Sequence, residues 1–166
     1  MKFDLKPISK MAVAVAIEKA MHYRLLNEPF EAESICLDVL EVDPENEQAL
    51  VVLLLALTDR FGRGRALSDN QAEQLAKRLS DDYQRTYYSG IICERKGKAS
   101  LTLGGPSAKF DAYEWLREAM TWFEKAESVR PPDNDDALLR SNACARIIMR
   151  YRLTAPPPET FEPSLE

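Results

Sequence analysis

The side chains that most often carry chemistry are few in this chain and lie far apart. There is one histidine, His22, and there are three cysteines, Cys36, Cys93 and Cys144. Structural zinc sites usually take ligands from a short Cys-x-x-Cys pair, and the sequence contains no such pair. Glu18 lies one helical turn before His22, but no serine or cysteine nearby forms a nucleophile pair with the histidine. We therefore expect no catalytic residue, no metal and no organic cofactor.

Two acidic pairs and one glycine-rich segment could also carry chemistry, but each has a structural explanation. Asp81 and Asp82, and likewise Asp135 and Asp136, precede predicted helices, where carboxylates cap the first turn and complement the helix dipole. Segment 62–65 reads Gly-Arg-Gly-Arg, which lacks the spacing of a phosphate-binding loop and follows no strand. We predict that the chain is not an enzyme.

The composition is typical of one globular domain. The 166 residues include 27 acidic and 22 basic side chains, which gives a formal net charge of -5. This balance argues against nonspecific binding of nucleic acid, which needs a basic surface. The apolar run 11–17 is too short to cross a bilayer, so no membrane segment is expected. The dispersed cysteines are expected to be buried free thiols, which indicates a cytoplasmic protein.

Apolar residues recur at steps of three and four along most of the chain, which predicts an all-α fold. No alternating segment is long enough to predict a strand. Prolines, glycines and capping residues give the boundaries of the helices within a domain that spans residues 1–153. Seven helices are expected: 8–26, 29–40, 45–60, a fourth that follows a Ser68–Gln71 capping box and runs to 79, 81–96, 108–129 and 134–153.

Two connections invite specific predictions. Asp43 is expected to cap the third helix, with Pro44 in its first turn. Segment 97–107 reads GKASLTLGGPS and is predicted to be a long, turn-rich loop.

Residues 154–166 form a proline-rich C-terminal tail. Such a tail cannot continue a helix, and its one aromatic residue, Phe161, is expected to be buried against helical surface. Glutamates of the tail could meet three arginines on one side of the last helix. That cluster is interpreted as a solvated face, with an acidic ligand or the tail itself as the alternative. Its members are Arg140, Arg146 and Arg150.

The helical pattern also repeats. Segments 32–44 (AESICLDVLEVDP) and 119–131 (AMTWFEKAESVRP) share the spacing of a small residue, a larger side chain one turn later and a final proline. This pattern resembles the tetratricopeptide repeat (TPR) family. The matching positions are Ala20, Tyr23, Ala32, Val39, Pro44, Gly90, Gly97, Ala119, Phe123, Ala126 and Pro131.

The resemblance covers residues 13–145 unevenly. Cys36 stands where an aromatic residue is usual, and no proline follows Ala66 at the expected place. About seventeen extra residues separate Gly90 from Ala119, compared with the ordinary repeat. The resemblance implies an antiparallel helix-hairpin stack with a right-handed superhelical arrangement. Ala32 and Ala119 should then lie where two helices approach closely.

In the TPR family the first helix of each hairpin lines a concave groove. The corresponding side chains here are mostly apolar and aromatic, so the groove is expected to bind an amphipathic or extended apolar peptide. A clamp for a C-terminal carboxylate is not expected, because Ile17 and Val52 occupy two of the positions that it needs. The same residues could instead pack against the tail or a second subunit. The groove residues are Ile17, Met21, Arg24, Val51, Leu55, Tyr87, Ile91 and Glu94.

These observations favour a non-enzymatic protein-interaction module. Its partner would be a peptide segment or another subunit, which includes a second copy of the chain, and neither nucleic acid nor membrane is expected. One alternative is a small cytosolic chaperone of the secretion type, since some TPR chaperones are acidic and of similar size. The alternative of another class is a small enzyme whose site is not recognisable from the sequence.

Overall fold

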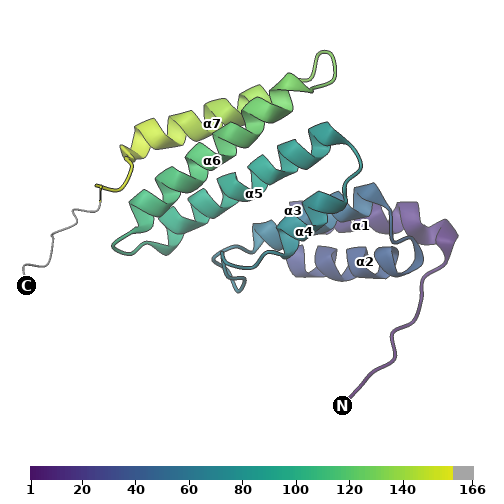
Figure 1. Ribbon diagram of the computed structural model, residues 1–166. Helices are drawn as coiled ribbons and strands as arrows, with labels where there is room; N and C mark the ends of the chain where they lie inside the picture. Colours follow the sequence, from purple (N-terminus) through teal and green to yellow (C-terminus); the bar gives the residue numbers. More distant parts are fainter. Residues whose placement is uncertain (159–166) are drawn as a thin grey trace, which may run out of the picture.

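The computed structural model describes residues 1–158, and this part of the chain is helical without strands (Figure 1). The predicted all-α fold with seven helices is confirmed. A short 3-10 turn, Lys10–Ala12, leads into the first helix. The helices are α1 (Val13–Leu25), α2 (Pro29–Val42), α3 (Glu47–Asp59), α4 (Gln71–Arg78), α5 (Asp82–Leu103), α6 (Ala108–Ser128) and α7 (Asp136–Tyr151).

The helices form a row in which each one packs against the next in sequence (Figure 1). In addition α1 contacts α3, and α3 contacts α5. Short connections join most of the consecutive helices, which is the arrangement of stacked helical hairpins. Helices α1, α3 and α5 therefore lie side by side and share one side of the stack.

The buried side chains form two clusters. The first lies among α1 to α4 and also receives Ile92 and Ala99 from α5. The second lies among α5, α6 and α7. Leu55 of α3 and Tyr88 of α5 pack against both clusters and join them. Helix α3 is buried on most of its surface, as its continuous apolar run 49–57 predicts for a helix in the middle of a stack.

Small residues allow α5 and α6 to approach closely. A Cβ atom placed on Gly90 would lie 2.5 Å from the ring of Phe123, and one on Gly97 would lie 2.9 Å from the side chain of Leu116. Ala32 and Ala119, which were predicted to lie where two helices approach closely, are fully buried. The spacing of small residues therefore reflects close helix packing.

The loop predicted at 97–107 is wrong, because α5 continues to Leu103. Gly97 does not form a turn; it lies within α5, where the absence of a side chain allows close contact with α6. Ala99 and Ser100, which follow it, are buried. The connection is reduced to residues 104–107, where Gly104 and Gly105 adopt positive φ angles of 70° and 109°. The extra residues of this hairpin thus lie in two long helices, of 22 and 21 residues.

Two capping predictions are also wrong. The third helix begins at Glu47, and its cap is Asn46, whose Oδ1 accepts the backbone N–H three residues later at 2.9 Å. Asp43 instead accepts a hydrogen bond from the Asn46 side chain at 2.9 Å. Asp69, not Ser68, accepts the backbone N–H at the start of α4. A short polar side chain in the preceding turn takes the capping role in both places.

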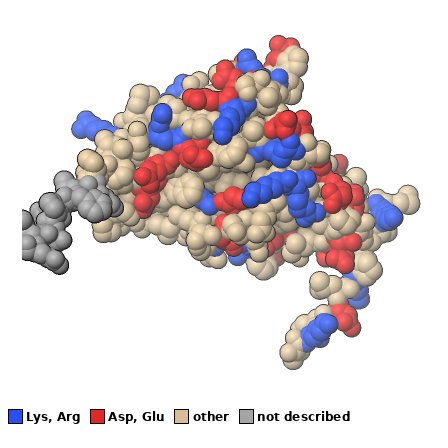
Figure 2. All heavy atoms as spheres, in the orientation of Figure 1, with Lys and Arg blue, Asp and Glu red and all other residues tan. Residues whose placement is uncertain are grey.

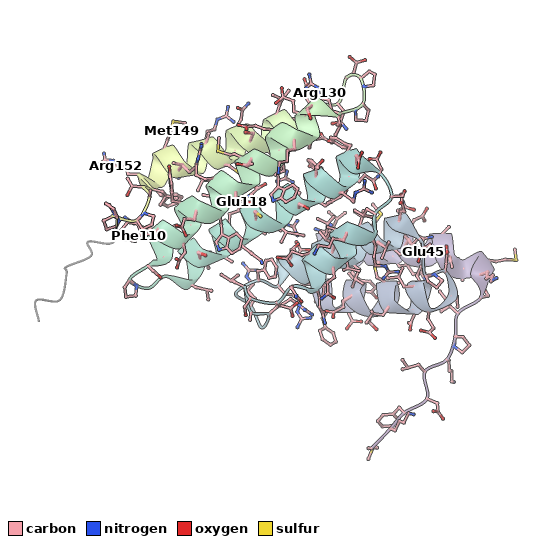
Figure 3. All side chains as sticks on the ribbon, viewed as in Figure 1. Glu45, Phe110, Glu118, Arg130, Met149 and Arg152 are labelled. Atoms are coloured by element: carbon pink, nitrogen blue, oxygen red, sulfur yellow. The ribbon has the colours of Figure 1, made fainter. Side chains whose placement is uncertain are left out.

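Helix α7 packs on one side only. Ala137 and Cys144 are buried against α6, whereas Met149 is exposed on the outer side of the helix (Figure 3). Leu153 follows the helix and is buried, and residues 154–158 are exposed. The predictions for the tail residues Glu159, Phe161 and Glu162 lie outside the described residues.

Candidate functional site

The eight predicted groove residues do not form one open apolar surface. Ile17 and Ile91 are only 3% and 2% exposed and belong to the core, so neither can contact a partner. Glu94 is 1% exposed and takes part in ion pairs. Met21 is exposed on α1, and the remaining four are half-buried: Arg24, Val51, Leu55 and Tyr87. The predicted groove was expected to be apolar, but its apolar members Ile17 and Ile91 are buried in the core.

Charged side chains connect the helices on this face instead. Asp59, the last residue of α3, accepts two hydrogen bonds from Arg24 of α1, at 2.7 and 3.2 Å. Arg95 of α5 also donates a hydrogen bond to Asp59, from its Nη1 to Oδ1 at 2.7 Å. One aspartate thus joins α1, α3 and α5 at a single point.

Arg95 is held by the protein itself. Its Nη1 also donates to the Leu55 carbonyl oxygen at 2.8 Å and to the Thr58 hydroxyl at 2.6 Å. Burial lowers the pKa of Arg95 from its ordinary value, and the charge of Asp59 opposes this shift. An arginine keeps its charge under any ordinary condition, so Arg95 supplies a fixed positive charge beneath the surface.

Glu94 forms the corresponding link between α5 and α7. Its Oε1 accepts hydrogen bonds from Lys98 and, at 3.4 Å, from Arg140 of α7. Its Oε2 is buried and has no hydrogen-bond partner. Partial burial lowers the pKa of Arg140, but the neighbouring Tyr87 and Glu94 outweigh it and raise that pKa overall. Two cations therefore contact one oxygen of this carboxylate, and the other oxygen is buried without a partner.

These residues line an open cleft of about 380 Å³ that crosses α1, α3, α5 and α7. The loop after α3 adds Arg63 at its edge. A second hollow of about 330 Å³, between α5 and α7, shares Lys98 and Thr102 with the first and adds Arg146 and Arg150. We call the two together the cationic cleft.

The lining of the cationic cleft differs from the rest of the protein in charge. It contains seven of the chain's 22 basic residues but only two of its 27 acidic ones, Asp59 and Glu94. Figure 2 shows acidic and basic side chains mixed over one face of the molecule. A cleft lined mainly by one sign of charge concentrates the field and attracts ligands of opposite charge. The basic residues are Arg24, Arg63, Arg95, Lys98, Arg140, Arg146 and Arg150.

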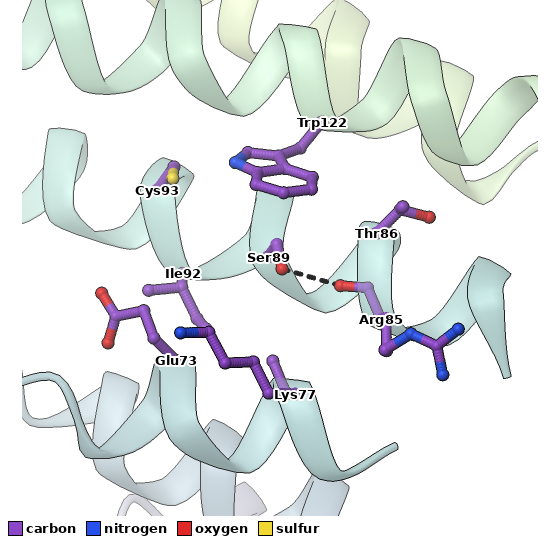
Figure 4. A pocket seen from close by; sticks show the side chains of 9 residues that line it. Glu73, Lys77, Arg85, Thr86, Ser89, Ile92, Cys93 and Trp122 are labelled. Carbon is purple, nitrogen blue, oxygen red and sulfur yellow. Dashed lines mark hydrogen bonds between the residues drawn. The ribbon is translucent and has the colours of Figure 1, made fainter. Parts of the chain in front are cut away.

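Another cavity, of about 310 Å³, lies between α4, α5 and α6 (Figure 4). Trp122 covers it from α6, and its floor includes Ile92 and Cys93 of α5. Two of its polar side chains are engaged by the protein: Arg85 donates to backbone oxygens just after α4, and the Ser89 hydroxyl donates to the Arg85 carbonyl oxygen at 2.7 Å. Glu73 lines the cavity as well, and its Oε2 is buried without a hydrogen-bond partner. The exposed lining of this cavity is mainly apolar.

The side chains first considered for chemistry are dispersed. His22 is exposed on α1, and within residues 1–158 no three His, Cys, Asp or Glu side chains are grouped to hold a metal ion. The three cysteines are buried, and burial raises the pKa of each thiol to about 12. Across the same described part of the chain, every helix is too short or too polar to cross a membrane.

Sequence reasoning named the arginines of α7 and dismissed the segment that contains Arg63, and it missed Asp59, Arg95 and Lys98. Their position in the sequence could have indicated them, because each lies on α3 or α5, or just after α3. These are first helices of hairpins, the elements that carry most of the predicted groove residues. Comparison of the chain with protein-family models, with curated protein sequences and with solved structures finds no match.

Proposed function

We propose that this protein is a non-enzymatic, cytoplasmic interaction module that binds an acidic peptide segment of another protein in the cationic cleft. The observation that carries the proposal is the concentration of basic side chains in a cleft that spans four helices of an otherwise acidic chain. Three separate buried thiols fit a reducing compartment.

The shape of the cleft supports an extended ligand. Its two hollows meet at Lys98 and Thr102 and run from Arg24 on α1 to Arg150 on α7. A ligand that follows this path passes several cations in succession, which suits a segment with acidic side chains at intervals. The stack of consecutive helices, in which α1, α3 and α5 lie side by side, is consistent with the TPR-like arrangement that we propose for the fold.

The charge of Glu94 supports a peptide rather than a phosphate polymer. Its carboxylate lies in the lining of the cleft and is only 1% exposed, so it acts on a ligand through its charge rather than by direct contact. A phosphate polymer carries a negative charge at every unit and would be repelled along its whole length, whereas a peptide can present a neutral stretch next to Glu94. Glu94 thus favours a peptide within a surface that attracts anions.

The proposal is tested by fluorescence anisotropy with labelled peptides in which acidic residues are interspersed with apolar ones. Binding in the micromolar range is expected, with affinity that falls as salt is added because the contacts are charged. Lysine-containing peptides of the same length should not bind. A series of peptides is needed, since the spacing of the acidic residues is to be determined.

Charge reversal locates the site. Arg63→Glu combined with Arg146→Glu should weaken peptide binding at least about tenfold, because both exposed arginines line the cleft. Arg117→Glu, an equivalent change on the exposed side of α6, is the matched control and should have little effect. Equal losses in the two variants, or no binding of any acidic peptide, would refute the proposal.

A further inference from the structure

The outward face of α1 is unusually apolar. Ten of the sixteen exposed large apolar side chains in the described part of the chain fall within the first thirty residues. On α1 and the turn before it, Met11 and Leu25 are 94% and 85% exposed, and Val15 and Leu26 are also exposed. Exposed apolar patches of this kind usually mark an interaction surface.

The exposed residues of this face have a regular spacing. Met11, Val15, Glu18, His22 and Leu25 follow one another at alternating steps of four and three, and all five are exposed. Alternating steps of four and three produce the contact seam of paired helices. We call these five residues the α1 seam; it is apolar at both ends and polar in the middle.

The α1 seam is complementary to a reversed copy of itself. In an antiparallel helix pair, the alternating steps align Glu18 with His22 of the second copy and Val15 with its Leu25. The carboxylate then meets an imidazole N–H donor twice, once on each side of the two-fold axis. A parallel pair would instead place Glu18 against Glu18, where like charges repel.

We propose that two copies of this chain associate through antiparallel packing of the α1 seam. The helix packs against α2 and α3 with its opposite side, where Ile17 and Ala20 are buried, so the seam is free to contact a second molecule. The outer surface of α7, at the other end of the stack, is mixed: it exposes Arg146 and Arg150 beside Leu139, Met149 and Tyr151. End helices of stacked-helix proteins are normally polar on the outside, and α1 departs from that rule.

We infer a second copy of the chain as the partner because of the pattern of the α1 seam. A reversed α1 places apolar residues against the apolar ends of the seam and polar residues against its polar centre. The interface would be small, since α1 has 13 residues. A small interface of this kind indicates a weak dimer with a dissociation constant in the micromolar range.

Light scattering coupled to size-exclusion chromatography tests the dimer on the full chain, from micromolar to millimolar concentration. The mass should rise towards twice the 18.8 kDa of one chain as concentration increases. Val15→Glu with Leu25→Glu should yield a monomer with an unchanged circular dichroism spectrum. Leu103→Glu with Leu139→Glu, at exposed apolar positions away from α1, should leave the dimer intact.

Two further variants test the antiparallel register. Glu18→Lys and His22→Glu should each weaken the dimer, and the double variant should restore it because the introduced lysine then faces the introduced glutamate of the second copy. Under oxidation, Val15→Cys with Leu25→Cys should form a linked dimer more readily than Val15→Cys alone.

Three results would overturn the proposal. A monomer at every concentration, linkage through Val15→Cys alone, or a failure of the double charge exchange to restore association would each do so. If the chain is monomeric and removal of residues 159–166 increases the binding of a hydrophobic dye, the tail covers the seam instead. Peptide binding in the cationic cleft is measured independently, so that proposal is unaffected by these outcomes.

Discussion

Glu94 is the residue at which structure and proposed function meet most closely. A carboxylate that is 1% exposed must be stabilised by charge or hydrogen bonds, and Lys98 and Arg140 provide this through one oxygen. The other oxygen has no protein partner. The residue therefore holds two cations in place and also puts a negative charge beneath a cleft that is otherwise lined by cations.

Glu94→Gln should separate these two roles. The amide keeps the shape but removes the negative charge, so Lys98 and Arg140 lose their counter-charge, whereas affinity for an acidic peptide that places a neutral stretch there should change only about twofold. Binding of inorganic polyphosphate should increase, because the carboxylate no longer repels it. Isothermal titration calorimetry with both ligands measures the change, with Glu118→Gln on the surface of α6 as the control (Figure 3). The interpretation fails if polyphosphate binding does not increase, or if both affinities change by the same factor.

The buried cysteines predict how stability depends on alkaline pH. Burial raises the pKa of the Cys36, Cys93 and Cys144 thiols from 9.0 to about 12. Below pH 9 the thiols are protonated in both states, so their contribution to stability is fully present. Between pH 9 and 12 the unfolded chain ionises first, and stability falls by up to about 1.4 kcal/mol per pH unit for each thiol.

Urea denaturation at pH 8 and pH 10 measures this loss. Cys36→Ala should reduce the difference between the two pH values, because one of the three thiols is removed. The same difference in the variant and the original chain would show that other groups cause the alkaline loss.

At the scale of the elements, α5 shows what can and cannot be predicted from the sequence. Its first part was predicted from apolar periodicity, since Tyr83, Tyr87 and Ile91 recur at four-residue steps. Its extension through Gly97 was missed, because a glycine followed by serine, threonine and more glycine is typical of a turn. Gly97 is explained only by the side chain of Leu116 on α6, which a local pattern cannot reveal.

The packing of α5 against α6 predicts a graded response to added methyl groups. Gly90→Ala would place Cβ 2.5 Å from the Phe123 ring, and we expect a loss of about 1–3 kcal/mol from overpacking. Gly97→Ala should cost less, because its Cβ would lie 2.9 Å from the Leu116 side chain, a less severe overlap than that at Gly90.

Thermal denaturation of both variants measures the difference, and Phe123→Leu should partly rescue Gly90→Ala by making room for the methyl group. A Gly90→Ala protein as stable as the original would contradict the close approach of the two helices.

At the scale of the whole molecule, the α-helical row could be predicted from the sequence, but the chemistry of its shared face could not. Apolar residues such as Val51 and Leu55 were assigned to a groove from their register alone. In the sequence, Asp59 is 35 residues from Arg24 and 36 residues from Arg95. The three side chains become partners only when α1, α3 and α5 lie side by side. No periodic pattern within one helix records such a pairing, because the charges belong to different helices.

Asp59 is therefore expected to matter for the stability of the whole stack. Asp59→Asn leaves Arg24 and Arg95 without their shared negative charge, and we expect a loss of about 1–3 kcal/mol because both arginines are partly buried. Asp82→Asn removes an exposed ion pair with Arg85 and should change stability by about 0–1 kcal/mol. Chemical denaturation of the two variants gives the comparison, and equal effects would show that Asp59 does not link the helices energetically.

The order of the helices in space follows their order in the chain, and this has a consequence for how the protein is made. Most of the packing that buries α1 to α4 joins segments close together in sequence, which is the condition for rapid folding. Ribosomes add roughly 5–20 residues per second, so several seconds pass between the synthesis of α4 and that of α7. The N-terminal cluster therefore has time to assemble while the ribosome is still adding the C-terminal hairpin, and Ile92 and Ala99 complete it when α5 emerges.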